Sequence, residues 1–190
     1  EKILATVKAG KFLTHHVTPQ PHSGTVNLSA ADRHGNFVAL TLTHGEAFGA
    51  RVTVDGLGLT LGHGMSRFDP RPDHPNAPGP GKRPLHNMTP SIVTRDGRAV
   101  LAIGGAGGRK IPNSEFEILT RILALGKTLP EAMAAPRIHT EGDRALSFEK
   151  SWPAMETAAL SELGYRVSTG GSASIGAVGY DKGALIKLRR

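Results

Sequence analysis

Apolar and polar residues alternate in two neighbouring runs near the start of the chain, TVNLSAAD at residues 25–32 and FVALTLTH at residues 37–44. Alternation is typical of strands that bury one face, and the RHGN sequence between the runs is typical of a tight turn. The pattern therefore predicts a β-hairpin. A further strand is predicted at residues 50–54, and a second hairpin at residues 88–105, where RDGR joins two apolar runs.

After the second hairpin the apolar spacing changes to a helical period. SEFEILTRILALG, residues 114–126, predicts a helix that a glycine ends. A short second helix is predicted in TLPEAMAAP, where Thr128 and Glu131 have capping-box spacing. A third is predicted in WPAMETAALSELG, with Ser151 as its N-cap. The apolar side expected of the first helix consists of Phe116, Ile118, Leu119, Ile122, Leu123 and Leu125.

Strand-like runs return at residues 165–188, so the predicted order is strands, helices and strands again. Because regular strand–helix–strand alternation is missing, the fold class predicted is α+β, with layered sheets and helices. Residues 69–81 hold five of the thirteen prolines and predict a surface loop. Residues 1–24 predict the end of a strand or helix followed by an exposed linker.

The composition is that of a globular protein with one domain, since 38% of the 190 residues are hydrophobic and 21% are charged. Cysteine is absent, which excludes disulfides, thiol catalysis and cysteine-bound zinc. No apolar stretch approaches the roughly 20 residues that cross a bilayer, so no membrane span is predicted. Because the chain does not begin with methionine, we expect it to be the C-terminal part of a longer precursor.

The net charge of +7 raises the question of nucleic-acid binding. The cations are scattered and aromatic residues make up only 5% of the chain, so neither a basic helix nor a stacking platform is present and no nucleic-acid partner is predicted. The nine histidines include no helical HExxH pair, and His15, His16 and His86 have no paired-ligand spacing. Neither a metal nor another cofactor is predicted.

A glycine cluster, IGGAGGRKIPN at residues 103–113, joins the second predicted hairpin to the first helix. Backbone amides at such a place can bind an anion or an oxyanion, but a tight bend that requires glycine dihedrals gives the same pattern. The cluster lacks the lysine and hydroxyl residue of a phosphate-binding P-loop and the GxGxxG spacing of a dinucleotide turn, which disfavours nucleotide binding.

Five segments occur in an order that resembles a known family: GTVNLSAADRHGN, FVALTLTHGEAFG, GKRPLHNMTPSIV, GGAGGRKI and EAMAAPRIHTEGD. Together they are similar to the small subunit of the gamma-glutamyltransferase family, and the resemblance covers about residues 20–180. The family's Asp-x-x-Gly-Asn turn corresponds to residues 32–36. The family's spacing, counted back from this turn, leads to Thr25.

The resemblance implies an N-terminal-nucleophile (Ntn) hydrolase fold, an αββα sandwich of two stacked antiparallel sheets flanked by helices. It also implies a precursor that cuts itself between Gly24 and Thr25. Residues 1–24 would then be the end of the large-subunit region or a linker, and residues 25–190 the nucleophile-bearing domain. The expected partner is a large-subunit chain from the same precursor, and the resemblance favours a periplasmic or extracellular location.

In the family, the N-terminal threonine is the nucleophile, and its free α-amine, with an ordinary pKa of about 7.7 to 8.0, can accept the hydroxyl proton. Thr25 corresponds to this nucleophilic threonine. Thr43 corresponds to the threonine that hydrogen-bonds the nucleophile, although an ordinary strand threonine remains the alternative. Gly107 and Gly108 correspond to the pair whose amides form the oxyanion hole.

Four positions depart from the family's substrate-binding pattern. Gly45 stands in place of an asparagine, Arg67 in place of an aspartate, and His86 and Asn87 in place of a serine pair. The aspartate pairs with the substrate's α-ammonium group, which Arg67 would repel. Arg67 could instead receive a carboxylate or lie beside an uncharged acyl group, or it could face solvent.

The function predicted is therefore a self-processing N-terminal-threonine amidohydrolase or acyltransferase that forms an acyl-enzyme on Thr25. Its acyl-group specificity is expected to differ from that for the γ-glutamyl group, with a small-molecule amide or γ-glutamyl-like compound as substrate. The alternative is a non-catalytic or unprocessed homologue that acts as a binding or structural protein.

Overall fold

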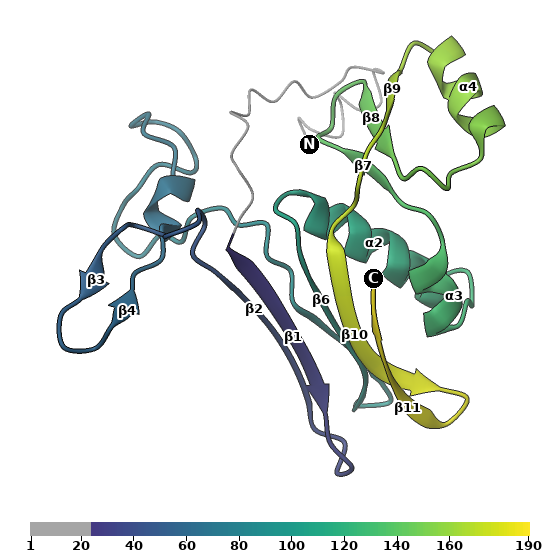
Figure 1. Cartoon of the computed structure of the whole chain (residues 1–190), viewed down its shortest axis with the longest axis horizontal. Helices are drawn as coiled ribbons and strands as arrows, with labels where there is room; N and C mark the ends of the chain where they lie inside the picture. The colour runs from purple at the N-terminus through teal and green to yellow at the C-terminus, as the bar shows by residue number, and fades with distance from the viewer. Residues whose placement is uncertain (1–23) are drawn as a thin grey trace.

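The structure, a computed structural model, describes residues 24–190, and of the lead-in segment predicted at residues 1–24 all but Gly24 lies outside this range. Figure 1 shows two layers of strands with the α-helices on one side of them. The elements are β1 (Thr25–Ala31), β2 (Phe37–Thr43), β3 (Thr53–Val54), β4 (Leu59–Thr60), the 3-10 helix η1 (Gly64–Arg67), β5 (Ser91–Arg95), β6 (Arg98–Ala106), α2 (Lys110–Leu123), α3 (Leu129–Ala134), β7 (Ile138–Thr140), β8 (Ala145–Phe148), α4 (Ala154–Glu162), β9 (Arg166–Thr169), β10 (Ser174–Asp181) and β11 (Ala184–Arg189).

A four-stranded antiparallel sheet in the order β11-β10-β6-β5 forms the centre of the fold. The β1-β2 hairpin lies across one face of this sheet, and α2 and α3 pack on the other (Figure 1). Adjacent glycines of β6 mark the two faces, since a side chain at Gly104 would meet Asn27 of the hairpin and one at Gly105 would meet Ile111 of α2. These layers confirm the predicted α+β fold.

The hydrophobic core lies between the central sheet and α2, where Ile103, Ile111, Ile118 and Ile175 are fully buried. Helix α2 begins at Lys110, four residues before the predicted window. Proline is tolerated in the first turn of a helix because amides there need no helical partner, so Pro112 does not delay the start. The predicted apolar side was partly wrong, because Phe116, Leu123 and Leu125 are exposed.

The N-terminal caps predicted for α3 and α4 had different outcomes. The predicted capping box of α3 is confirmed, with Thr128 and Glu131 each bonding the other's backbone amide. The prediction of Ser151 as the N-cap of α4 was wrong, since Pro153 has that position and makes no side-chain cap. Helix α4 packs beside a separate three-stranded sheet, β7-β8-β9, in which β8 and β9 run parallel.

The β1-β2 hairpin and its turn form as the alternation predicted. The Asp32 carboxylate accepts hydrogen bonds from the amides of His34 and Asn36 and from the Asn36 side chain. The strand predicted at residues 50–54 is reduced to β3, and Arg51 before it has a positive φ of 57° that interrupts an extended strand.

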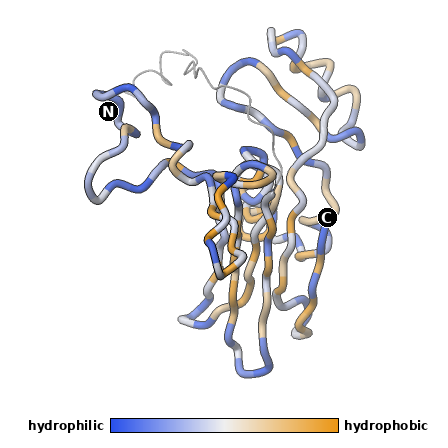
Figure 2. Tube along the Cα trace, turned by 60° about the vertical axis from the view of Figure 1, so that its left-hand side comes forward, coloured by the Kyte–Doolittle hydropathy of each residue, from blue (hydrophilic) through white to orange (hydrophobic). Residues whose placement is uncertain are grey.

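The faces of the β1-β2 hairpin are reversed relative to an ordinary surface hairpin. Its polar residues point towards the central sheet, together with Ala31, Phe37 and Ala39, while its larger aliphatic residues form an exposed outer face. Figure 2 shows the alternation of hydrophobic and hydrophilic residues along the strands. We call this surface the outer hairpin face; its aliphatic residues are Val26, Leu28, Val38, Leu40 and Leu42, each between 50% and 59% exposed.

Within residues 24–190, no helix has the length and apolar character needed to cross a bilayer.

Candidate active site

Two threonine hydroxyls meet at the open end of the β1-β2 hairpin. Thr25 is the first residue of β1, Thr43 is the last of β2, and the antiparallel register pairs them directly. Their Oγ1 atoms are 2.9 Å apart. The Gly45 amide donates to Thr43 Oγ1 at 2.9 Å, so the Thr43 hydroxyl proton is available to donate to Thr25.

The hairpin ladder continues one residue beyond this pair. The His44 amide donates to the Gly24 carbonyl oxygen at 3.2 Å, so the carbonyl that precedes Thr25 is already hydrogen-bonded. Gly24 has a φ of 101°, and a Cβ at this position would lie 3.1 Å from the Glu46 carbonyl oxygen. The Gly24–Thr25 bond therefore lies at a strand end where the conformation favours glycine.

The second candidate group, Gly107 and Gly108, forms the bend between β6 and α2. Both have positive φ, at 147° and 64°. Their carbonyls accept from the amides of Lys110 and Ile111 as the helix begins. Among residues 24–190 neither glycine amide donates a hydrogen bond to the protein, so both are free to bind a ligand oxygen.

A small cavity brings the end of β6 together with Thr25. Its volume is about 170 Å³, and Thr25 and Ala106, which precedes Gly107, are both in its wall. Arg189 of β11 also lines it. Sequence reasoning missed Arg189, because only the pairing of β11 with β10 brings this distant cation near Thr25.

A buried ion-pair network supports the glycine bend from behind. A Cβ on Gly107 would lie 2.8 Å from Ala173 Cα, and the Ala173 carbonyl accepts from Arg137 Nη1 at 3.0 Å. Arg137 is 2% exposed, and its Nη2 pairs with Glu149 at 3.1 Å. Burial opposes ionisation of Glu149, but the Ser172 hydroxyl and the charges of Arg137 and Arg190 outweigh it and lower the pKa of Glu149.

Arg67, His86 and Asn87 are all half-buried, and the first two interact electrostatically. The pKa of His86 is lowered by burial and by the Arg67 charge, both of which favour the neutral imidazole. Asn76, which the sequence analysis missed, joins the two segments. Its Nδ2 donates to the Arg67 carbonyl at 2.6 Å, and its Oδ1 accepts from the Leu85 amide at 2.9 Å.

Gly45 connects this group to the threonine pair. It has a φ of 84°, and a Cβ there would contact His63, the residue immediately before η1, at 3.4 Å. The His63 amide donates to the His44 carbonyl at 2.8 Å. The strand that ends in Thr43 is thus joined directly to the 3-10 helix that ends in Arg67.

Another unpredicted ionisable group lies in α2. Glu115 is 2% exposed, and burial raises its pKa to about 7, against the opposing effect of the Thr89 and Ser91 side chains. Its position in the apolar helical pattern gave no reason to separate it from an ordinary surface glutamate.

The described residues contain no group of three or more histidine, cysteine, aspartate or glutamate side chains that could hold a metal ion.

The family model for gamma-glutamyltranspeptidase matches residues 4–185 of the chain. The chain belongs to the gamma-glutamyltranspeptidase family. A glutathione hydrolase proenzyme from Pseudomonas aeruginosa is 40% identical over 138 residues, which cover 66% of this chain and 25% of the relative. The acylase ACY 1 proenzyme of a Pseudomonas species is 31% identical over 166 residues, covering 87% of this chain and 30% of the relative.

Solved structures agree with this assignment. A gamma-glutamyltranspeptidase from Pseudomonas nitroreducens, complexed with L-DON, superposes with a TM-score of 0.73 at 31% identity, covering 86% of this chain and 93% of that one. The chain therefore has the Ntn-hydrolase fold of gamma-glutamyltranspeptidases. It spans about a quarter of the length of the glutathione hydrolase proenzymes it matches.

Proposed function

We propose that this chain is the nucleophile-bearing part of a self-processing amidohydrolase or acyltransferase, with Thr25 as nucleophile. The observation that carries the proposal is the 2.9 Å contact between the Thr25 and Thr43 hydroxyls beside a hydrogen-bonded Gly24 carbonyl. The boundary between residues 1–24 and residues 25–190 would be the processing site.

Processing begins when Thr25 Oγ1 attacks the Gly24 carbonyl carbon. The developing oxyanion is stabilised by the His44 amide, whose hydrogen bond to this carbonyl strengthens as negative charge grows. The hydroxyl proton passes to the departing Thr25 nitrogen, which leaves Gly24 attached to Thr25 as an ester. Water then hydrolyses the ester and releases the Gly24 carboxylate, the Thr25 hydroxyl and a free α-amine.

In turnover, the new α-amine accepts the Thr25 hydroxyl proton as Oγ1 attacks a substrate amide. The hydrogen bond between the Thr25 and Thr43 hydroxyls keeps Thr25 Oγ1 oriented. The amides of Gly107 and Gly108 stabilise the tetrahedral oxyanion, and loss of such a donor costs roughly 100- to 1000-fold in rate. The amine leaving group departs with the proton, and water or an acceptor amine resolves the acyl-enzyme.

Arg67, His86 and Asn87 are proposed to select the acyl group, with Gly45 leaving room beside them. Arg67 is half-buried and interacts electrostatically with His86, and its positive charge would repel an α-ammonium group. The relatives include both a glutathione hydrolase and an acylase. The proposed substrate is an amide whose acyl group carries a carboxylate or no charge at this position.

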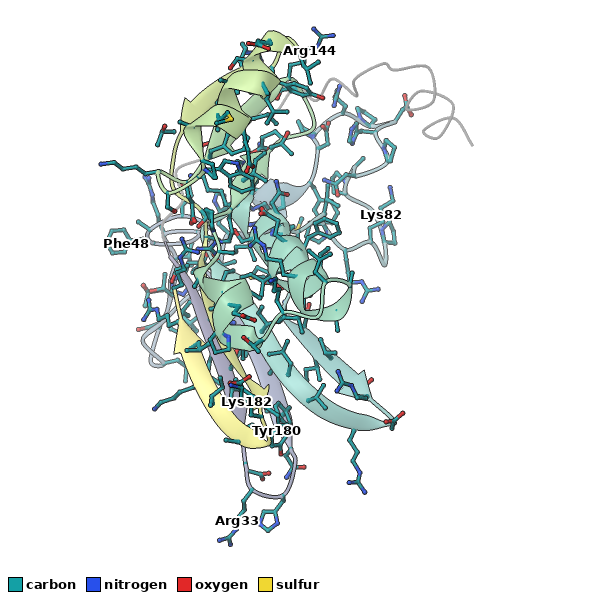
Figure 3. All side chains as sticks on the ribbon, turned by 90° about the vertical axis from the view of Figure 1, so that its right-hand side faces the viewer. Arg33, Phe48, Lys82, Arg144, Tyr180 and Lys182 are labelled. Carbon is teal, nitrogen blue, oxygen red and sulfur yellow. The ribbon has the colours of Figure 1, made fainter. Side chains whose placement is uncertain are left out.

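We further propose a large-subunit chain as partner. The outer hairpin face exposes five aliphatic side chains in one continuous patch, which is unusual for a free monomer surface. Phe48, 73% exposed, projects away from the ribbon in the loop after β2 (Figure 3). The relatives extend over about four times the matched length, so a further chain segment is available to cover these residues.

The proposal is tested by intact-mass analysis of the precursor during incubation. A new N-terminus at Thr25 is expected, with no cleavage in Thr25→Ala and cleavage retained in Thr25→Ser. Absence of cleavage in the native protein would favour a binding or structural role. Turnover of a γ-glutamyl anilide is then compared with that of carboxyacyl and neutral acyl anilides, and a strong preference for the γ-glutamyl compound would contradict the role given to Arg67.

A further inference from the structure

The side chain of Asn27 fills the space between the nucleophile strand and the central sheet. Asn27 follows Thr25 by two residues, so it points to the same face of β1. Its carboxamide lies over Gly104 of β6 and Gly176 of β10, which are cross-strand partners. A Cβ at Gly104 would lie 2.1 Å from Asn27 Nδ2, and one at Gly176 would lie 2.8 Å from Oδ1.

The two glycines therefore leave the room that the carboxamide occupies, since real Cβ atoms do not approach other atoms so closely. Neither glycine has a positive φ, so conformational demand does not explain them. Their absence of a side chain is explained by the fit to Asn27.

Hydrogen bonds hold the carboxamide in this place. Asn27 Nδ2 donates to the Leu40 carbonyl at 3.1 Å and lies 3.4 Å from Thr41 Oγ1. The Ser29 hydroxyl donates its single proton to the Gly176 carbonyl at 3.2 Å and lies 3.5 Å from Asn27 Oδ1, too far to hold the carboxamide. Asn27 and Thr41 are paired in register, and on this face of the hairpin they are the next pair after Thr25 and Thr43.

This arrangement connects the two halves of the candidate active site. Gly104 lies three residues before Gly107 on the same continuous stretch of chain, while Asn27 lies two residues after Thr25. The height of the carboxamide above Gly104 therefore fixes how far β1 lies from β6. Resting on the function proposed above, we propose that Asn27 is a positioning residue that sets the distance between the Thr25 hydroxyl and the oxyanion-binding amides.

The size of the side chains at the two positions provides a direct test. Gly104→Ala alone should force β1 away from β6, and Asn27→Ala alone should leave the spacing unsupported. Each is expected to lower kcat by about 100-fold with little change in KM, since displacement of reacting groups by about 1 Å has effects of this size. The double variant removes the overlap and refills part of the space, and it should recover kcat to within about 10-fold of the native protein.

Ser29→Ala is the matched control, because it removes a neighbouring polar group from the same face of β1 without touching Gly104. It should lower the melting temperature but change kcat less than about threefold, as expected for a hydrogen bond without a positioning role. All variants are measured in the full precursor and its processed product, with cleavage rate, kcat, KM and melting temperature recorded for each.

Three results would overturn the inference: equal losses of kcat in Asn27→Ala and Ser29→Ala, a loss confined to KM, or no recovery in the double variant. A native protein that neither cleaves nor turns over amides would instead refute the proposed function. In that case crystal structures still decide the spacing, because a displacement of Thr25 relative to Gly107 below about 0.5 Å in Gly104→Ala would contradict a positioning role for Asn27.

Discussion

Residues of the candidate site differ in whether the sequence alone predicts their neighbours. Thr43 is the simplest case, because its position at the end of β2 follows from the hairpin register. His86 is the opposite case, because it interacts electrostatically with Arg67 across two segments that Asn76 of the proline-rich loop joins. A residue's type and spacing can predict the first arrangement but carry no information on the second.

Replacement of Thr43 by alanine is expected to slow processing by about 10- to 100-fold. The Thr25 hydroxyl would lose its 2.9 Å partner, and the Gly45 amide would lose its acceptor. The measurement is the rate of appearance of the Thr25 N-terminus by intact mass. Thr43→Ser keeps the hydroxyl and should process within about threefold of the native rate; a serine variant as slow as alanine would contradict this account.

Glu115 should make stability depend on pH in the direction opposite to an ordinary ion-paired carboxylate. Its folded-state pKa of about 7 is above the ordinary value of 4.5, so the folded protein binds the extra proton. The stability associated with protonated Glu115 is fully present below pH 4.5 and is lost as the pH rises through about 7. Glu115→Gln should therefore flatten the dependence and raise the free energy of unfolding at pH 8 by up to about 3 kcal/mol.

Urea unfolding of the native protein and the glutamine variant at pH 5 and pH 8 measures this difference. Glu162→Gln, at an exposed position of α4, serves as the control and should leave the pH dependence unchanged. Parallel pH profiles for native protein and Glu115→Gln would mean that Glu115 is ionised in the fold at neutral pH.

At the scale of secondary-structure elements, the sequence was most informative where a signal is local. The hairpin turn and the capping box of α3 depend on contacts within five residues, and both formed as predicted. The start of α2 and the N-cap of α4 were missed, because the glycine bend and Pro153 set them through backbone geometry. Alternation in β1 and β2 predicted two faces, but it could not indicate which one meets the central sheet.

The bend between β6 and α2 gives a prediction at this scale. Gly107→Ala combines a φ of 147° with a contact of 2.8 Å to Ala173, so it should displace the bend as well as strain it. A loss of about 100-fold in kcat is expected from the displaced amides, together with a lower melting temperature.

Gly97→Ala is the control that separates backbone strain from displacement of the bend. Gly97 has a positive φ of 77° in the β5-β6 turn, but a Cβ there would meet nothing within 4 Å. This control should cost about 1 kcal/mol of stability through the backbone alone and leave kcat unchanged. A Gly107 variant with the kinetics of the Gly97 variant would exclude a role of the bend in catalysis.

For the whole molecule, the described residues supply two sheet layers but helices on only one side of them. The outer hairpin face is the surface left without cover, and its apolar residues are opposite the polar ones that meet the central sheet. The proposed large-subunit partner would account for the outward-facing apolar residues by covering this face. Assembly should therefore depend on this face more than on other exposed apolar positions.

Leu40→Asp is expected to prevent co-purification of the tagged chain with the proposed large-subunit chain, because a carboxylate would be buried without a partner in the proposed interface. Leu185→Asp is the matched control, since Leu185 is also exposed, at 40%, but lies on β11 at the far edge of the central sheet. It should leave co-purification unchanged. If Leu40→Asp assembled as well as Leu185→Asp, the large subunit would have to bind elsewhere, and the reversed hairpin would need a different partner.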